Sequence, residues 1–442
     1  MTTALLKDLS DKLSASEPTL SRLDAYYDGT QPAAFLSVEA REALGDKLRV
    51  LAVNFPRLAV QAVAERLQVK GFQTGGEGSD PDAELWGIWR RNRMEDAAAQ
   101  AHVDALVYGR LFVIVWAGKN GQPLITVESP KQVAVLRDPA TREVTSAMKR
   151  WVSNGKGHAV LYEAHQITRY VSQANVVEGS TPGSTGWELA ETIANPLGVV
   201  PVVPIVNRGR LLEVDGVSEM EDLLDLSDGL NKIMSDALVT SEFYARPRRW
   251  ATGLEIVEDE NGKPVKPFSS ALDDIWQSEA PDTKFGQFEA ASLSGYSDLA
   301  AMLTQQIGAL STLPPHYLGL NGDQPPSADA IRSAEASLVS RVYALQRTFG
   351  QSWDDVARLV LAVRDGSDPA QLDVRTAWVN PETRTDAQAA DAAAKLVGVG
   401  VPLTIVLEDQ LGMTPAQVDR VRAAVRTGAL DSAGVDLTEL TA

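Results

Sequence analysis

Apolar residues recur in steps of three and four along a segment that follows a loop rich in proline and glycine. The loop reads LPPHYLGLNGDQPPS and ends at Ser327. Its last two prolines lack an N–H donor and restrict the residue before them, while Ser327 can cap the free N–H groups that follow. From Ile331 to Val363 the apolar residues keep helical spacing. The pattern predicts an amphipathic helix from Ser327 to about Arg364, roughly 55 Å long.

In the first half of the chain, the spacing of apolar residues changes from helical to strand-like near residue 110. Before this point the spacing is helical, and helices are predicted over residues 5–13, 54–67 and 82–108. After it, short β-branched or aromatic runs alternate with turn residues as far as Val171, which indicates an antiparallel meander. Residues 174–198 are polar and glycine-rich and predict a loop or hairpin. The run VVPVVPIVN that follows predicts an edge strand or extended segment, because its prolines bar a central position.

The third section, from residue 217 to residue 320, predicts a helix, a small β segment and a second helix. The first helix has an apolar stripe that includes Leu224 and Leu230. Its other face is nearly all acid, with Lys232 as the single base. The acidic residues of this face include Glu221, Asp222, Asp225, Asp228 and Asp236. An Asn-Gly turn at residues 261–262 marks the β segment, so the section is typical of a stalk with a tip.

The last section predicts a strand near residues 374–379 and a helical C-terminus from residue 385 to about residue 426. Helices and antiparallel strands therefore follow one another in blocks, which predicts the α+β fold class. With 442 residues, 44% of them hydrophobic, the chain can bury more than one core. Two or three domains are expected.

Composition and charge narrow the class of protein further. The chain has no cysteine, which excludes a disulfide scaffold and thiolate chemistry. Its first residues lack the apolar core of a secretion signal, and no stretch predicts a membrane span. We therefore expect a protein made and used in a cytoplasm. The formal net charge of -18 would repel nucleic acid at long range, although an acidic chain can still enclose a duplex in a passage with few contacts.

Signatures of enzymes are absent from the sequence. The four histidines are scattered, and none has the spacing of an HExxH zinc site. No P-loop and no GxSxG motif occurs. Acidic pairs such as Asp354-Asp355 could bind a metal, but adjacent carboxylates usually mark solvated positions. We expect no catalytic residue, no metal site and no cofactor; a metal-dependent nuclease is the enzymatic alternative.

Four stretches of the chain carry a resemblance to a known family. They are YYDGTQPAAFL at 26–36, NFPRLAVQAVAERLQVKGF at 54–72, YGRLFVIVW at 108–116 and LPPHYLGLNGDQPPSADAIRSAEASL at 313–338. In these stretches, and in the order of helix, β segment, helix, loop and long helix, the chain resembles the portal proteins of tailed bacteriophages, particularly of siphoviruses infecting actinobacteria. Another capsid-associated connector or minor head protein without a DNA channel is the alternative from the structural class.

The resemblance implies a homo-oligomeric ring, usually of twelve subunits, at one vertex of the capsid. Double-stranded DNA would be driven through its channel by the terminase large subunit and later released into the tail. A head-completion or adaptor protein, the major capsid protein and the scaffold protein are the other implied partners, and no membrane is involved. The protein would be part of the virion and would be assembled in the host cytoplasm.

The structural parts of portal proteins can be assigned to residue ranges of this chain. The resemblance implies an α/β wing, a two-helix stem, a small β clip, a tunnel loop, a long wing helix and a helical crown. The corresponding ranges are 1–215 with 327–384 for the wing, 216–244 and 293–311 for the stem, 245–292 for the clip, 312–327 for the tunnel loop, 328–365 for the long wing helix and 385–442 for the crown.

Candidate functional residues follow from these assignments. In the tunnel loop, the residues expected near DNA are Pro314, Pro315, His316, Tyr317, Asn321 and Gln324. The acidic face of the stem helix is expected to line the channel, where like charge would let phosphates slide. In the clip, Arg246, Arg248 and Arg249 are expected to pair between subunits or touch phosphates, and Lys263 and Lys266 to meet a partner.

Two plainer interpretations of the same residues stay open. The stem carboxylates could face solvent or pair with neighbouring arginines. In the loop, Leu318 and Leu320 could simply pack against the wing, with His316 as a structural partner.

Overall fold

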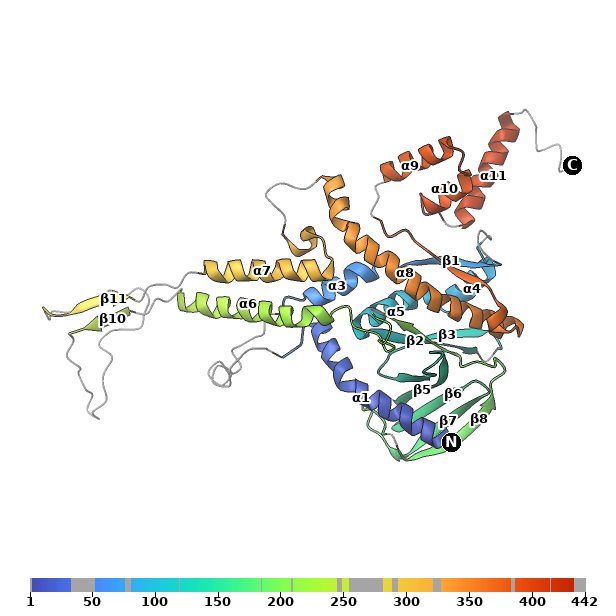
Figure 1. The fold of residues 1–442 in the computed structure, drawn as a ribbon, viewed down its shortest axis with the longest axis horizontal. Helices are drawn as coiled ribbons and strands as arrows, with labels where there is room; N and C mark the ends of the chain where they lie inside the picture. Colours follow the sequence, from blue (N-terminus) through green and yellow to red (C-terminus); the bar gives the residue numbers. More distant parts are fainter. Residues whose placement is uncertain are drawn as a thin grey trace.

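The molecule is elongated and contains both helices and sheets. The computed structural model describes residues 2–32, 52–75, 81–118, 120–183, 185–207, 210–244, 249–253, 281–287, 293–320, 327–382, 386–413 and 415–432. A body of sheets and helices lies at one end, and two long antiparallel helices project from it (Figure 1). The α+β class is therefore confirmed.

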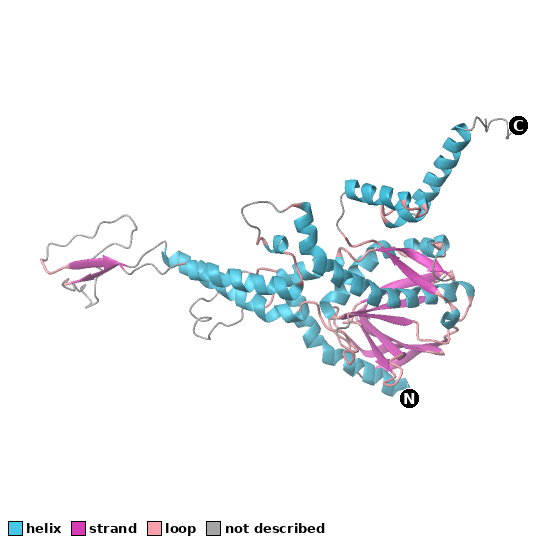
Figure 2. Cartoon of the chain, turned by 45° about the horizontal axis from the view of Figure 1, so that its top comes forward, coloured by secondary structure: helices cyan, strands magenta, loops and turns pink. Residues whose placement is uncertain are grey.

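Two antiparallel sheets form one side of the body (Figure 2). The three-stranded sheet has the order β3-β2-β9, from β2 (Arg110–Ala117), β3 (Pro123–Glu128) and β9 (Val202–Val206). The five-stranded meander contains β4 (Val133–Arg137), β5 (Val144–Ser153), β6 (Lys156–Glu163), β7 (Gln166–Asn175) and β8 (Trp187–Ala194). The predicted antiparallel strands are confirmed, and so is the edge position of the proline-containing strand β9. The prediction of a single meander from residue 111 to residue 171 was wrong, because β3 does not pair with β4 and the strands divide between two sheets.

The N-terminal helix α1 (Thr2–Asp28) covers one face of the five-stranded sheet. Its contacts there come from Leu6, Leu9 and Leu13, packed against Met148 and Leu161. The predicted helix over residues 5–13 was too short, because α1 continues through Pro18 to Asp28. Leu20 and Leu23 are buried beyond the proline, and their packing offsets the backbone hydrogen bond that a proline removes from a helix.

The larger core lies between the three-stranded sheet and four helices, α3 (Phe55–Ala64), α4 (Ala83–Arg91), α5 (Met94–Tyr108) and α8 (Ala328–Asp365). The single helix predicted over residues 82–108 was wrong, because the chain breaks between α4 and α5. Arg93 has φ 56° there. The Asn92 side chain donates to Pro123 O at 3.1 Å and accepts from Ile125 N–H at 3.1 Å, so the break ties the two helices to β3.

The long helix α8 agrees with the prediction at both ends. Ser327 accepts a hydrogen bond from the Ala330 N–H, and Gly366 ends the helix in the left-handed conformation. The buried stripe includes Leu338, Val342 and Phe349. A short 3-10 helix, η4 (Pro369–Gln371), leads to β12 (Val374–Trp378), the predicted strand. Its partner β1 (Val69–Thr74) was missed, since residues up to 110 were read as mainly helical.

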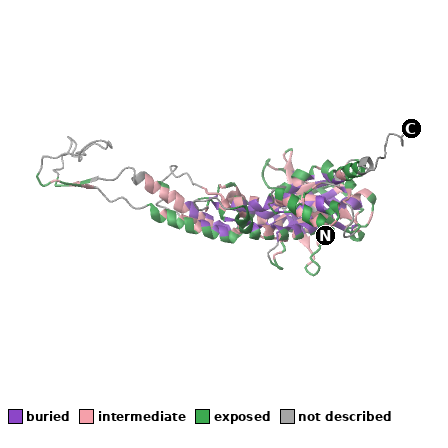
Figure 3. Ribbon diagram, turned by 90° about the horizontal axis from the view of Figure 1, so that it is seen from above, coloured by how far each residue is buried: buried purple, intermediate pink, exposed green. Residues whose placement is uncertain are grey.

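The two projecting helices, called the stalk here, are α6 (Leu224–Tyr244) and α7 (Ser294–Ser311). A 3-10 turn, η2 (Glu221–Leu223), precedes α6. The predicted helix began too early, because the backbone N–H groups of Val217 and Glu219 donate to Asn207 O and Leu106 O in the body. At the far end of the stalk, β10 (Arg249–Thr252) pairs with β11 (Lys284–Gln287) and forms the tip (Figure 1). Buried residues gather at the end of the stalk next to the body (Figure 3).

Three helices follow the body: α9 (Asp386–Gly398), α10 (Leu403–Asp409) and α11 (Pro415–Ser432). They are called the C-terminal unit below. Lys70 Nζ on β1 donates to Glu408 O at 2.7 Å and ties this unit to the body. None of the helices in the described part of the chain combines the length and apolar character needed to cross a membrane.

Candidate functional site: the stalk, its root and the proline-rich loop

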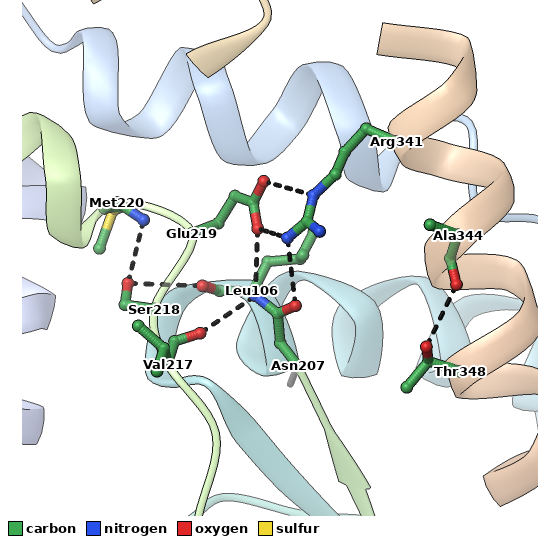
Figure 4. Close-up of polar contacts among 9 residues, drawn as sticks. All are labelled: Leu106, Asn207, Val217, Ser218, Glu219, Met220, Arg341, Ala344 and Thr348. Carbon is green, nitrogen blue, oxygen red and sulfur yellow. Dashed lines mark hydrogen bonds and ion pairs between the residues drawn. The ribbon is translucent and has the colours of Figure 1, made fainter. Parts of the chain in front are cut away.

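The stalk begins at a polar joint between segments that lie far apart in the sequence. Arg341, in α8, donates from Nε to Glu219 Oε1 at 3.0 Å and from Nη2 to Glu219 Oε2 at 2.5 Å. The same Nη2 lies 3.3 Å from Asn207 Oδ1, and the Asn207 amide donates to Glu219 Oε2 at 3.1 Å (Figure 4). Two parallel bonds between guanidinium and carboxylate are strong and directional. They raise the pKa of Arg341 above its usual value.

Backbone contacts close the same joint, which is called the root joint below. The Val217 N–H donates to Asn207 O at 3.0 Å, and the Glu219 N–H donates to Leu106 O at 2.8 Å. Gly216 has φ 77°, and a Cβ there would lie 2.0 Å from Gly109 O. Only glycine tolerates both the conformation and the approach. The direction in which the stalk leaves the body is thus fixed by a glycine crossing and an ion pair.

Three of the five acidic residues predicted on the stalk face have partners. Glu221 Oε1 accepts from Arg22 Nη2 at 2.7 Å, and Asp236 pairs with Lys232 one turn away. Asp228 Oδ2 accepts from the Tyr26 hydroxyl at 2.7 Å. Burial raises the pKa of the Asp228 carboxyl, although the bond from Tyr26 acts in the opposite direction. Glu221 and Asp228 therefore hold the start of the stalk against α1, while the Asp236 pair stays within α6.

Asp222 and Asp225 differ from the other three. Both are exposed. Within the residues that the structure describes, neither accepts a hydrogen bond nor pairs with a base. Their position along the stalk makes them the carboxylates of this set that remain available to act on something outside the subunit.

The stalk also exposes apolar side chains on both of its helices. Leu238 of α6 is 55% exposed, and Leu310 of α7 is 56% exposed. Leu299 and Met302, also on α7, are exposed as well. With Leu310 they follow helical spacing along one side of α7. Exposed apolar stripes of this kind mark contact surfaces.

The described part of the proline-rich loop is folded back against the body. Residues 315–318 form the 3-10 helix η3 (Pro315–Leu318), and Pro314 and Leu318 are buried. Tyr317 OH accepts from Arg66 Nη2 at 3.0 Å, while His316 Nε2 lies 3.7 Å from Glu335 Oε1. These contacts match the plainer interpretation of this part of the loop. Contact with DNA stays a prediction, and two of its residues, Asn321 and Gln324, lie outside the described residues.

Arg66 connects this loop to two further segments. It donates to Glu335 Oε1 on α8 at 3.0 Å and to Pro381 O, ahead of the C-terminal unit, at 3.1 Å. The side chains of Arg66 and Glu335 are 14% and 6% exposed, so the pair is largely shielded from water. Sequence reasoning missed Arg66, Glu335, Asn207 and Arg341. The signal for Arg341 was its place beside Leu338 and Val342 on the buried stripe of α8.

Of the basic residues predicted at the tip, one lies among the described residues. Arg249 opens β10. Arg246, Arg248, Lys263 and Lys266 lie outside the described residues. Their roles stay predictions.

Groups of three or more potential metal ligands do not occur among the described side chains. The most perturbed histidine is His102, which is buried and accepts from Trp353 Nε1 at 2.9 Å. Burial lowers the pKa of His102 to about 4, while a hydrogen bond with the Leu67 backbone acts in the opposite direction. It packs among aromatic rings of the body core, so it belongs to the packing of the body rather than to a site.

Comparison with known proteins places this architecture in one family. The family model described as "Phage portal protein, SPP1 Gp6-like" matches residues 6–416. The chain therefore belongs to the phage portal protein family. Portal proteins are structural components of the phage capsid and are not enzymes.

Relatives from two mycobacteriophages agree with this assignment. The portal protein of Mycobacterium phage L5 is 32% identical over 420 residues, which cover 89% of this chain and 84% of the relative. The portal protein of Mycobacterium phage D29 is 34% identical over 367 residues, which cover 79% of this chain and 73% of the relative. The resemblance to portal proteins of siphoviruses infecting actinobacteria is confirmed.

Similar chains occur in two solved structures of gene transfer agent particles. A chain of the virion of a native particle is 14% identical, with coverage of 78% of this chain and 84% of that chain and a TM-score of 0.45. A chain of the neck of an empty particle, computed with C6 symmetry, is 12% identical, with coverage of 83% and 90% and a TM-score of 0.47.

Proposed function

We propose that copies of this chain form a closed ring at the unique vertex of the capsid and that double-stranded DNA passes through the hole of this ring. The ring has twelve subunits if it follows the number that the resemblance implies. DNA enters during packaging and leaves through the same hole toward the tail. Family membership over residues 6–416 supports this function.

The observation that supports ring formation is the exposed apolar side of the stalk. An amphipathic helix is stable when its apolar stripe is packed, and isolated helices of this length are marginal in water. In the single subunit, Leu238 and Leu310 are each more than half exposed. A neighbouring stalk would cover them, and such a contact repeated around an axis closes a ring.

In this arrangement the acidic side of the stalk faces the hole. Asp222 and Asp225 are exposed and have no basic partner among the described residues. Like charge keeps the phosphates of the duplex from adhering to the wall, so the DNA slides. The proposal thus needs no strong binding site for DNA in the stalk.

The remaining parts keep the roles that the resemblance implies. We assign residues 1–215 with 327–384 to the wing, 216–244 and 293–311 to the stem, 245–292 to the clip, 312–327 to the tunnel loop, 328–365 to the long wing helix and 385–442 to the crown. The clip, at the tip of the stalk, contacts the terminase large subunit and then the head-completion or adaptor protein. The wing faces the major capsid and scaffold proteins during assembly in the host cytoplasm.

A charge reversal tests the sliding surface. The double variant Asp222→Lys with Asp225→Lys places two ammonium groups where phosphates pass, and we expect about a tenfold fall in DNA-filled capsids at low salt, with partial recovery at high salt. The control is Asp8→Lys with Asp11→Lys, two exposed acids of α1 with the same spacing. Equal packaging by the stalk variant and the control at both salt concentrations would contradict the proposed surface.

A further inference from the structure

Helix α11 has almost no buried face of its own. Among its described side chains, at residues 417–428, Val418 is buried and Val421 is half-buried, and the others are exposed. Val425 continues the same stripe and is 55% exposed. The helix extends away from the body (Figure 1). A helix of this length without a packed stripe is not expected to be stable in water.

The rest of the C-terminal unit exposes apolar residues in the same way. Val399, between α9 and α10, is 79% exposed. Val397 of α9 and two residues of α10, Leu403 and Ile405, are also exposed. Among the side chains of the unit that the structure describes, the buried apolar ones are Ala393, Val406, Leu407 and Val418. This core is too small to stabilise three helices, so further burial has to come from outside the unit.

The two sides of the unit carry opposite charges. Helix α11 carries Arg420, Arg422 and Arg426 against the two acids Asp419 and Asp431. Arg422 lies 3.8 Å from Asp419, and neither Arg420 nor Arg426 forms an ion pair with a described residue. Helices α9 and α10 carry four acids against the single base Lys395, which pairs with one of them, Asp391, at 2.7 Å. The four are Asp386, Asp391, Glu408 and Asp409. Each copy therefore presents a basic apolar surface on α11 and an acidic apolar surface on α9 and α10.

We propose that α11 of one copy docks on the α9–α10 side of the next copy. Val421 and Val425 then pack against the exposed apolar residues of α9 and α10, and the arginines of α11 face Asp391 and Glu408. The contact is heterologous, since two different surfaces of the same unit meet, and a heterologous contact that repeats around an axis closes a ring. This inference rests on the proposed ring and adds a second contact to that of the stalk.

Charge complementarity favours a second copy over an unrelated protein as the occupant. Both halves of the contact are present on this chain, with net charges of opposite sign and with exposed apolar residues on each. Complementary potentials of this kind fix the register of a contact. The chain's own residues 433–442 are the other candidate cover for α11, and the experiment separates the two.

The experiment measures amide hydrogen exchange of residues 415–432 in the assembled full chain. Arg420→Glu with Arg426→Glu, and separately Asp391→Arg with Glu408→Arg, should each speed the exchange about tenfold, because each places like charges across the contact. The chain that carries all four substitutions should recover the protection of the wild type. Arg169→Glu, on the exposed side of β7, is the control and should leave α11 unchanged.

Several results would overturn the contact. One is a four-substitution chain that exchanges faster than either pair, because the effects would then be independent. Another is loss of protection in a chain that ends at Ser432, because the cover would then be residues 433–442. Rings in which α11 of the wild type is unprotected would overturn this contact alone, whereas a wild-type chain that forms no ring would overturn the proposed function as well.

Discussion

Loss of the root joint should lower the free energy of unfolding of the subunit by a measurable amount. Replacing Arg341 by methionine removes two bonds to Glu219 and one to Asn207, and leaves a carboxylate that is only 15% exposed without its cation. Breaking one side of a buried pair costs about 3–5 kcal/mol. Because the Arg341 side chain is 33% exposed, solvent screening reduces the expected loss to about 2–3 kcal/mol of unfolding free energy.

A double-mutant cycle measures this interaction. Arg341→Met, Glu219→Gln and the combined variant are compared by urea unfolding at one protein concentration, and we expect a coupling energy of about 2 kcal/mol. Arg341→Lys should recover less than half of the loss, since an ammonium group cannot make the forked contact. Arg169→Met is the control, because its pair with Glu191 is 3.4 Å long and exposed on both sides. Additive losses, or a loss no larger than that of the control, would refute the reasoning.

Two further predictions concern the body and the root. The pKa of His102 falls from 6.5 to about 4 on folding, so the unfolded state binds a proton at a higher pH than the folded state does. The free energy of unfolding should therefore decline by about 3 kcal/mol as the pH falls from 6.5 toward 4. His102→Gln, which keeps an acceptor for Trp353, should flatten this dependence on pH when urea midpoints are measured. Gly216→Ala should cost about 3 kcal/mol or more, because its Cβ would meet Gly109 O, whereas Gly198→Ala, with open space around it, should cost about 1 kcal/mol. An unchanged pH dependence of stability in His102→Gln would contradict the role given to His102. Equal losses of stability in Gly216→Ala and Gly198→Ala would contradict the close approach at Gly216.

The parts of the fold that sequence reasoning found are those that depend on neighbours in the chain. The start of α8 follows from Ser327 and the prolines before it, and its end from Gly366. The strands β4 to β7 are joined by short turns and pair in chain order, so each strand lies next to its partner in the sequence. Local spacing was enough in these cases.

The parts that were missed depend on contacts between distant residues. Strand β1 has a partner, β12, that lies about three hundred residues further along the chain, and propensity alone does not reveal such a pairing. The break between α4 and α5 is held by Asn92 through bonds to β3. Among the candidate functional residues, the sequence identified the acidic stalk face but could not tell that Glu221, Asp228 and Asp236 have partners.

The most direct test of the central claim is an electron cryomicroscopy reconstruction of the purified full-length protein, with native mass to count its subunits. The account predicts a closed ring in which α6 and α7 surround the hole and Asp222 and Asp225 face it. A monomer, or a ring whose stalks point away from the hole, would contradict the account.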